Sequence, residues 1–207
     1  MCDCIIFAGA ELNVSNFDVG SVNDKFVICA DKGVLHAHEL GIEPDLIVGD
    51  FDSLGYKPDN ECEIISFKPE KDDTDLMIAI KEAIKRGKKQ IMIYGALGGR
   101  LDHTIGNIQA LAYAVENCAS ASLISDSDIA AIYAPGEYEI SNKQGFSLSL
   151  FSYSENVCGI NLSGVKYPLE NGCITNSFPI GVSNEITGET AKISFEKGLL
   201  LVVMSRL

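Results

Sequence analysis

Positively charged residues are scarce in this sequence. Its 207 residues contain 16 Lys and Arg against 29 Asp and Glu, which gives a formal net charge of −13. Proteins that bind along DNA or RNA neutralise phosphates with many Lys and Arg side chains, whereas here acidic residues outnumber basic ones and the basic run at residues 85–89 is short. The composition therefore argues against nucleic acid as a partner.

The sequence also lacks long apolar segments, and we expect no secretory leader. The apolar run at residues 199–204 is far shorter than the roughly 20 residues that cross a bilayer. The first basic residue is Lys25, so the early run at residues 5–8 lacks the charged segment that opens a signal peptide. Seven cysteines, an odd number in a chain of this size, argue against a disulfide framework. We therefore expect a cytoplasmic protein with reduced, mostly buried thiols and no membrane partner.

The first two thirds of the sequence alternate between apolar runs and helical patterns. Hydrophobic residues make up 46% of the chain, enough for a substantial core. Leu76, Ile80 and Ile84 recur every four residues behind a capping residue, Thr74 or Asp73. Alternating strands and helices predict an α/β domain with a mainly parallel sheet covered on both faces. The expected strands lie at residues 4–7, 26–30, 46–48, 63–67, 91–94 and 122–124.

The last third of the sequence changes character. Helical periods disappear from about Ile132, and residues 145–151 alternate apolar and polar side chains between recurring turn signals. Such a pattern predicts an antiparallel β-sandwich or barrel. We place the boundary near residues 133–136. This makes residues 1–133 an α/β catalytic nucleotide-binding domain and residues 134–207 an all-β C-terminal sandwich domain.

Aspartates gather at the ends of the expected strands. They are Asp50, Asp52, Asp72, Asp73, Asp75 and Asp102. Ligands of parallel sheets bind beyond the carboxyl ends of the strands, so we expect these acids to converge. Two unit charges about 5 Å apart repel by roughly 3 kcal/mol at an effective dielectric of about 20. Mg²⁺, which prefers carboxylates and substrate phosphates, would relieve that repulsion.

Each acidic segment also has a plainer interpretation. Asp50 and Asp52 fit a turn after a strand as well as they fit a metal site. Acids at residues 72–75 complement a helix dipole, although three acids exceed what capping needs. Because Mg²⁺ usually takes only one or two carboxylates, the six cannot all be its ligands. Some must hold substrate or accept a proton.

The glycine-rich run at residues 95–99 precedes an expected helix. Its backbone N–H groups favour a close approach of phosphate, and Arg100 adds a planar, bidentate donor. The spacing matches neither a dinucleotide fingerprint nor a Walker A loop, so a flexible turn is the alternative. Lys32 fits a phosphate contact or an ordinary solvated position equally well, and His103 fits a catalytic role or a hydrogen bond at the helix start equally well. His36 is interpreted as a helix-surface residue.

Taken in order, these segments resemble the thiamine pyrophosphokinase (thiamine diphosphokinase) family over nearly the whole chain. The matching segments are Ala30-Asp31-Lys32-Gly33, Gly49-Asp50-Phe51-Asp52-Ser53, Lys71-Asp72-Asp73-Thr74-Asp75, Gly98-Gly99-Arg100-Leu101-Asp102-His103, Lys166-Tyr167-Pro168-Leu169 and Gly181-Val182-Ser183-Asn184-Glu185. Each segment alone is common, whereas the ordered set is specific.

The resemblance implies a reaction and an assembly. A diphosphate group passes from ATP to the hydroxyl of thiamine, giving thiamine diphosphate and AMP, with Mg²⁺ as cofactor. The protein is a homodimer that holds thiamine between the N-terminal domain of one subunit and Ser183, Asn184 and Glu185 of the other. The sequence has no Trp, so a Phe or Tyr packs on the thiamine ring where some relatives use Trp.

The resemblance also suggests residue roles. Asp50, Asp52 and Asp72 are expected to bind the metal and its waters. Asp75 contacts thiamine or accepts its hydroxyl proton, Arg100 holds phosphate, and Asp102 orients Arg100 or a metal-bound water. The residues expected at the nucleotide are Asp31, Lys32, Ser53, Lys71, Asp73, Thr74, Gly98, Gly99, Arg100 and His103.

Two other functions compete with this one. A Mg-dependent phosphohydrolase would use Asp50 as its nucleophile, but that motif normally follows the first strand, whereas here two expected strands precede the one that ends before Asp50. A non-catalytic Mg-nucleotide sensor would bind ATP without turnover, and it has no evident need for Asp75 and Asp102. Formation of AMP only with thiamine present decides against both.

Overall fold

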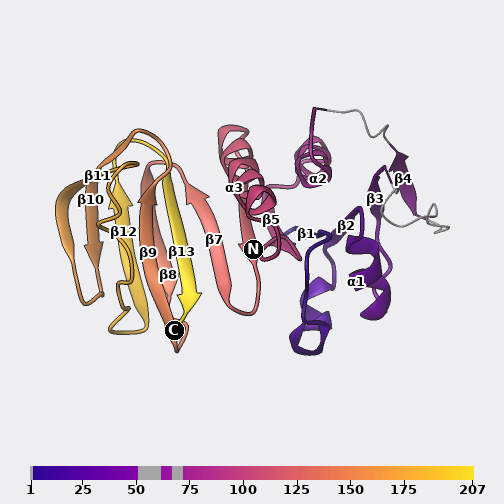
Figure 1. The fold of residues 1–207 in the computed structure, drawn as a ribbon, viewed down its shortest axis with the longest axis horizontal. Helices are drawn as coiled ribbons and strands as arrows, with labels where there is room; N and C mark the ends of the chain where they lie inside the picture. The colour runs from indigo at the N-terminus through magenta and orange to yellow at the C-terminus, as the bar shows by residue number, and fades with distance from the viewer. Residues whose placement is uncertain (1, 51–61, 67–71) are drawn as a thin grey trace. The chain divides into compact units, whose positions relative to one another are not determined.

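The computed structural model describes residues 2–50, 62–66 and 72–207 (Figure 1). The chain divides into two compact units, Met1–Asp126 and Ser127–Leu207. The expected boundary, near residues 133–136, lies slightly later in the chain. The strand at Asp128–Tyr133 belongs to the second unit because it pairs along its length with Leu200–Arg206. Within the described ranges, no helix is long and apolar enough to cross a membrane.

The first unit is built on a parallel sheet. Its strands follow the order β4-β3-β2-β1-β5-β6, and each pairs in parallel with its neighbours. The strands are β1 Cys4–Phe7, β2 Phe26–Ala30, β3 Leu46–Gly49, β4 Glu63–Ser66, β5 Gln90–Tyr94 and β6 Ser120–Ile124. The helices are α1 Gly33–Glu39, α2 Asp75–Lys85 and α3 Leu101–Glu116, with 3-10 turns η1 Val14–Asn16 and η2 Val19–Val22. The predicted α/β architecture is therefore confirmed.

Both faces of this sheet are covered. Successive residues of a strand point to opposite faces, yet Leu46, Ile47 and Val48 of β3 are all fully buried. On one face, Phe7 of β1 belongs to the same core cluster as Val34 of α1. Near-continuous apolar strands are what a sheet with two covered faces requires.

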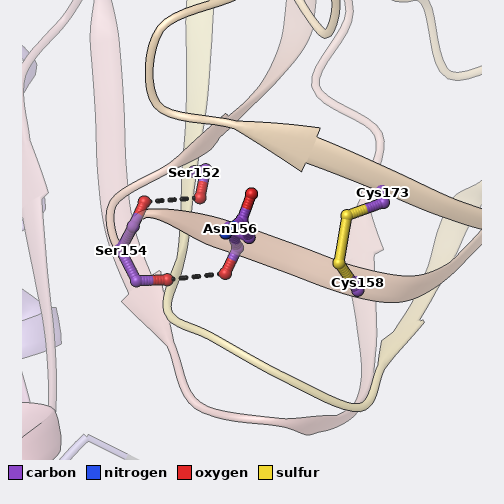
Figure 2. The surroundings of a disulfide bond; sticks show 5 residues. All are labelled: Ser152, Ser154, Asn156, Cys158 and Cys173. Atoms are coloured by element: carbon purple, nitrogen blue, oxygen red, sulfur yellow. Dashed lines mark hydrogen bonds between the residues drawn. A yellow bond between two sulfur atoms is a disulfide. The ribbon is translucent and has the colours of Figure 1, made fainter.

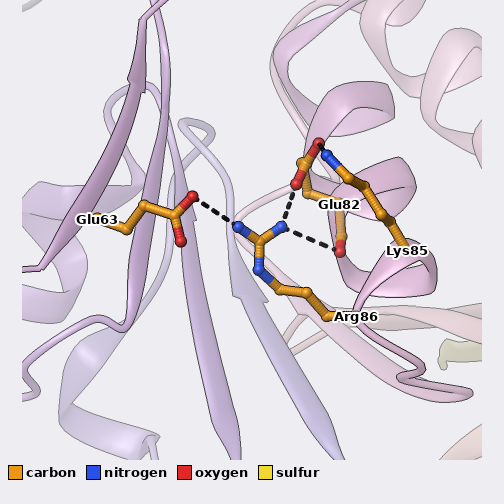
Figure 3. Close-up of polar contacts among 4 residues, drawn as sticks. All are labelled: Glu63, Glu82, Lys85 and Arg86. Carbon is orange, nitrogen blue, oxygen red and sulfur yellow. Dashed lines mark hydrogen bonds and ion pairs between the residues drawn. The ribbon is translucent and has the colours of Figure 1, made fainter.

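Helix α2 is fixed at both of its ends. At its start, the Thr74 hydroxyl accepts a hydrogen bond from the Met77 N–H, as an N-cap does. At its end, Arg86 reaches Glu63 of β4 at 2.8 Å and also binds Glu82 one turn back (Figure 3). The Arg86 bridge ties the last turn of α2 to the edge strand, and so helps to set where its first residue, Asp75, lies.

Gly33, the first residue of α1, lies close to the backbone at the end of β1. A Cβ at this position would lie 1.9 Å from the Phe7 carbonyl oxygen, a backbone atom that cannot move aside alone. We expect Gly33→Ala to destabilise the protein by about 1–3 kcal/mol, as overpacking does. Thermal unfolding measures this, because each kcal/mol shifts Tm by about 2–4 °C in a chain of this size.

Gly106 supplies the matched control. It lies inside α3, and apart from the adjoining residues and backbone of that helix, the Cβ of an alanine at this position would have no described atom within 4 Å. Gly106→Ala is expected to raise stability by roughly 0.5–1 kcal/mol, because glycine is unfavourable inside a helix. A Tm for Gly33→Ala equal to or above that of the parent would contradict the packing argument.

The second unit is an antiparallel sandwich. One sheet has the order β7-β13-β9 and the other β11-β10-β12-β8. Their inward side chains, among them Leu148, Ile160, Ile193 and Leu200, form one buried core. The predicted β-sandwich is confirmed. The strands are β7 Asp128–Tyr133, β8 Gly136–Ser141, β9 Phe146–Ser152, β10 Asn156–Ser163, β11 Leu169–Thr175, β12 Thr190–Phe195 and β13 Leu200–Arg206.

The expectation of seven free thiols is wrong for two of them. Cys158 of β10 and Cys173 of β11 are register partners and are joined by a disulfide, beside a turn in which Ser152 and Ser154 bind backbone carbonyls (Figure 2). Directly opposed residues on antiparallel strands lie close enough to bond, a pairing that the odd cysteine count hid. Among the free cysteines, Cys4 is buried, and burial raises the pKa of its thiol to about 12.

Candidate active site

A cavity of about 500 Å³ opens at the carboxyl ends of β1, β2 and β5. This is where parallel sheets bind ligands. Its lining brings together many of the residues singled out in the sequence: Asp31, Lys32, Thr74, Asp75, Gly98, Gly99, Arg100 and His103. Asp50, Asp72, Asp73 and Asp102 are not part of the lining. We call this cavity the strand-end pocket.

The wall that follows β2 contains Asp31 and Lys32. Asp31 has φ of +48°, a left-handed conformation that few residues other than glycine adopt, and its N–H donates to the Val48 carbonyl at the end of β3. A backbone held in such a conformation suggests a functional site. Both Asp31 and Lys32 line the pocket at this point.

The wall that follows β1 is tied to two other elements. The N–H of Ala8 donates to the Tyr94 carbonyl, and the N–H of Ala10 donates to the Gly95 carbonyl at 2.7 Å. From α1, His36 Nε2 lies 2.8 Å from the Ala10 carbonyl oxygen, so it is the donor. The interpretation of His36 as a plain surface residue missed this contact, which joins residues far apart in the sequence.

The wall that follows β5 is the glycine-rich segment. Gly98 and Gly99 have φ of +85° and +71°, which favour glycine. The guanidinium of Arg100 donates two hydrogen bonds to the Asp102 carboxylate, from Nε at 3.1 Å and from a terminal nitrogen at 2.6 Å. The hydrogen bond from Arg100 lowers the pKa of the exposed Asp102 carboxyl. Asp102 thus binds Arg100 but does not line the pocket.

The acids that precede α2 separate into different environments. Asp72 is exposed. Asp73 accepts two hydrogen bonds from Lys81, at 2.7 and 2.9 Å, and this pairing raises the pKa of the lysine. Asp75, the first residue of α2, is half-buried and lines the pocket. Of the three, only Asp75 lines the pocket.

The remaining predicted metal ligands are only partly described. Asp50 is half-buried directly after β3, while Asp52, Ser53 and Lys71 lie outside the described residues. Within residues 2–50, 62–66 and 72–207, no three acidic, His or Cys side chains gather as a metal site. The assignment of metal to Asp50, Asp52 and Asp72 therefore stays a prediction.

In the second unit, the segment predicted to hold thiamine is well ordered by its own contacts. Asn184 is buried, with its carbonyl oxygen accepting from the N–H groups of Tyr167 and Glu185 and its amide donating to the Tyr167 carbonyl. Glu185 pairs with Lys166 at 2.9 Å, and Ser183 is exposed with φ of +60°. The amide of Asn184 therefore holds this segment, which leaves Ser183 and Glu185 as the more accessible groups.

Comparison with known proteins agrees with this arrangement in both units. Residues 21–123 match the family model for the thiamin pyrophosphokinase catalytic domain, and residues 137–200 match that for the thiamin pyrophosphokinase vitamin B1 binding domain. The thiamine pyrophosphokinase of Bacillus subtilis (strain 168) is 34% identical over 184 residues, 86% of each chain.

Solved structures give the same picture. The crystal structure of thiamine pyrophosphokinase from Bacillus subtilis matches with a TM-score of 0.87 at 30% identity over 99% of both chains. That of thiamin pyrophosphokinase from Geobacillus thermodenitrificans matches with a TM-score of 0.84 at 28% identity, covering 100% of this chain and 98% of that one. The chain therefore belongs to the thiamine pyrophosphokinase family and is a transferase that makes thiamine diphosphate.

Proposed function

We propose that the strand-end pocket is where ATP gives its diphosphate group to thiamine. The observation that carries this proposal is the meeting of Lys32, Asp75 and Arg100 around one cavity of about 500 Å³, with Gly98 and Gly99 beside them. Cationic side chains and free backbone N–H groups suit a polyphosphate. A carboxylate across the same cavity suits a hydroxyl that must lose its proton.

The reaction needs one bond made and one broken. The thiamine hydroxyl oxygen attacks the β-phosphorus of ATP, and the bond from that phosphorus to the oxygen bridging the α and β positions breaks. The electron pair stays on that bridging oxygen, which leaves as part of AMP. The proton of the hydroxyl passes to the Asp75 carboxylate and then to water. In phosphoryl-type transfers, positioning and charge stabilisation supply most of the catalysis, and these tasks fall to Lys32 and Arg100.

A magnesium ion fits the donor chemistry at this end of the sheet. Asp50 directly follows β3 and Asp72 lies shortly before α2, and carboxylate oxygens are donors that Mg²⁺ accepts. When bound, the ion would neutralise charge on the phosphate oxygens. We assign its direct protein contacts to Asp50, Asp52 and Asp72.

Asp50→Asn tests the metal assignment. Removing one carboxylate should raise the Mg²⁺ concentration needed for half-maximal activity by about tenfold, since loss of one charged ligand costs on the order of 1.4 kcal/mol or more. Titration of initial rates with Mg²⁺ measures it, and Asp126→Asn, at the far end of the first unit's chain, serves as the control. Unchanged turnover with unchanged Mg²⁺ dependence would contradict the assignment.

We further propose a homodimer in which Ser183 and Glu185 of one subunit complete the thiamine site of the other. Several apolar side chains near this segment are exposed on the second unit: Tyr167, Phe178, Ile180 and Val182. Contiguous exposed apolar side chains mark interaction surfaces, and a second copy of the chain is the partner we assign to them. We also place the protein in the cytoplasm, where the Cys158–Cys173 disulfide is an exception to the reduced thiols usual in that compartment.

A single incubation tests the proposed reaction. Purified protein is mixed with ATP, Mg²⁺ and thiamine, and the nucleotide products are separated. We expect AMP and thiamine diphosphate in equal amounts, with no AMP when thiamine is omitted. ADP as the product would indicate an ordinary kinase, phosphate release without thiamine would indicate a phosphohydrolase, and binding without turnover a sensor. The comparisons favour neither of these last two.

A further inference from the structure

Asn107 makes a contact within the strand-end pocket that no motif predicted. It lies on α3 one turn beyond His103, so the two side chains share a helix face, and both line the pocket. The Asn107 Nδ2 group donates to the Ala96 carbonyl at 2.7 Å. The bond closes the glycine-rich segment, residues 95–100, back onto the helix that follows it.

The glycine-rich segment has backbone N–H groups that remain available to an anion. The Gly95 carbonyl accepts from Ala10, and the Ala96 carbonyl accepts from Asn107, so both acceptors are occupied. Across the part of the chain that the structure describes, the N–H groups of Leu97, Gly98 and Gly99 have no hydrogen bond within the protein. The two bonded carbonyls fix the start of the segment, and the unused N–H groups of residues 97–99 are donors that phosphate oxygens can accept.

We propose that Asn107 is a positioning residue for the diphosphate of the nucleotide. It acts by holding the Ala96 carbonyl, which keeps residues 97–99 in the conformation that leaves their N–H groups available. Without this bond, the Ala96 carbonyl is a buried acceptor without its partner, and the segment gains other conformations. This inference rests on the proposed function, because it takes the ligand of the pocket to be a nucleotide polyphosphate.

The test compares two asparagines, one in α3 and one at its end. Asn107→Ala removes the bond to Ala96. Asn117→Ala removes a similar bond, from Asn117 Nδ2 to the Tyr113 carbonyl at 2.8 Å, at the opposite end of α3. The measurements are KM for ATP, KM for thiamine, kcat, Tm, and the affinity for Mg-ADP by calorimetry without thiamine.

We expect Asn107→Ala to raise KM for ATP and to weaken Mg-ADP binding by about tenfold, with KM for thiamine unchanged. Asn117→Ala should leave both affinities at the parental values even where Tm falls. Parental ATP and ADP affinity in Asn107→Ala overturns the proposal, as does an equal loss for ATP and thiamine. If Asn107→Ala does not fold, Asn107→Ser, whose hydroxyl is too short for the same bond, is judged by the same outcomes.

The calorimetric arm separates this inference from the reaction proposed above. Mg-ADP binding that weakens in Asn107→Ala supports the role of Asn107 even if the parental protein forms no AMP, in which case only the reaction fails. If the parental protein forms AMP and Asn107→Ala has unaltered ADP affinity, the proposed reaction is supported and the role of Asn107 is contradicted.

Discussion

Asp75→Asn is expected to lower kcat by about 10²–10⁴-fold, the contribution of a well-placed general base. Asparagine has nearly the same shape but cannot accept the thiamine proton. Asp75 is half-buried, lines the strand-end pocket and begins α2. The neighbouring cap at Thr74 is left intact by this substitution. Steady-state kinetics with saturating ATP, Mg²⁺ and thiamine measures the change.

The control for Asp75→Asn is a substitution that changes the same charge elsewhere. Asp18 caps η2 by accepting from the Gly20 N–H, and asparagine can cap in the same way. Asp18→Asn should therefore keep parental kcat. A second comparison uses Asp73→Asn, which breaks the pair with Lys81. If Asp73→Asn lowers kcat as much as Asp75→Asn does, proton acceptance is not the special task of Asp75.

The different roles expected for Asp73 and Asp75 show what sequence patterns reveal and what they hide. The strands around the pocket were predictable, because β1, β2 and β3 are buried on both faces and must therefore be continuously apolar. Helix α2 was predictable from the recurrence of Leu76 and Ile80 and from its cap. These signals are local, and they are enough to place Asp50 directly after β3 and Asp75 at the start of α2.

Contacts between distant elements leave no comparable pattern. Asp73 and Lys81 are eight positions apart, beyond the three or four that mark neighbours on a helix. The contacts of His36 with Ala10 and of Asn107 with Ala96 each join a helix to a loop carbonyl. An acceptor that is a backbone carbonyl has no residue-type signature, so only coordinates reveal it. The same holds for Cys158 and Cys173, whose pairing depends on strand register.

Arg100 is the second residue for which we expect a large effect. Arg100 lines the pocket, and hydrogen bonds between charged groups contribute about 1.5–3 kcal/mol each. Arg100→Ala should therefore raise KM for ATP by about 10–100-fold. Arg100→Lys keeps the charge but loses the two-pronged geometry, and it should still bind ATP several-fold more weakly than the parent. Parental ATP kinetics in a folded Arg100→Lys variant would show that the fork is not used.

The pair formed by Arg100 and Asp102 allows the role of the acid to be decided. Asp102 binds the guanidinium through both oxygens and is absent from the pocket lining. If Asp102 acts only by orienting Arg100, then Asp102→Asn weakens ATP binding less than Arg100→Ala does, and the double variant is no worse than Arg100→Ala alone. Such non-additivity is the mark of two residues that act as one unit. Additive losses would mean that Asp102 works independently of Arg100, as a group holding water or metal does, because its contribution would then survive removal of the guanidinium.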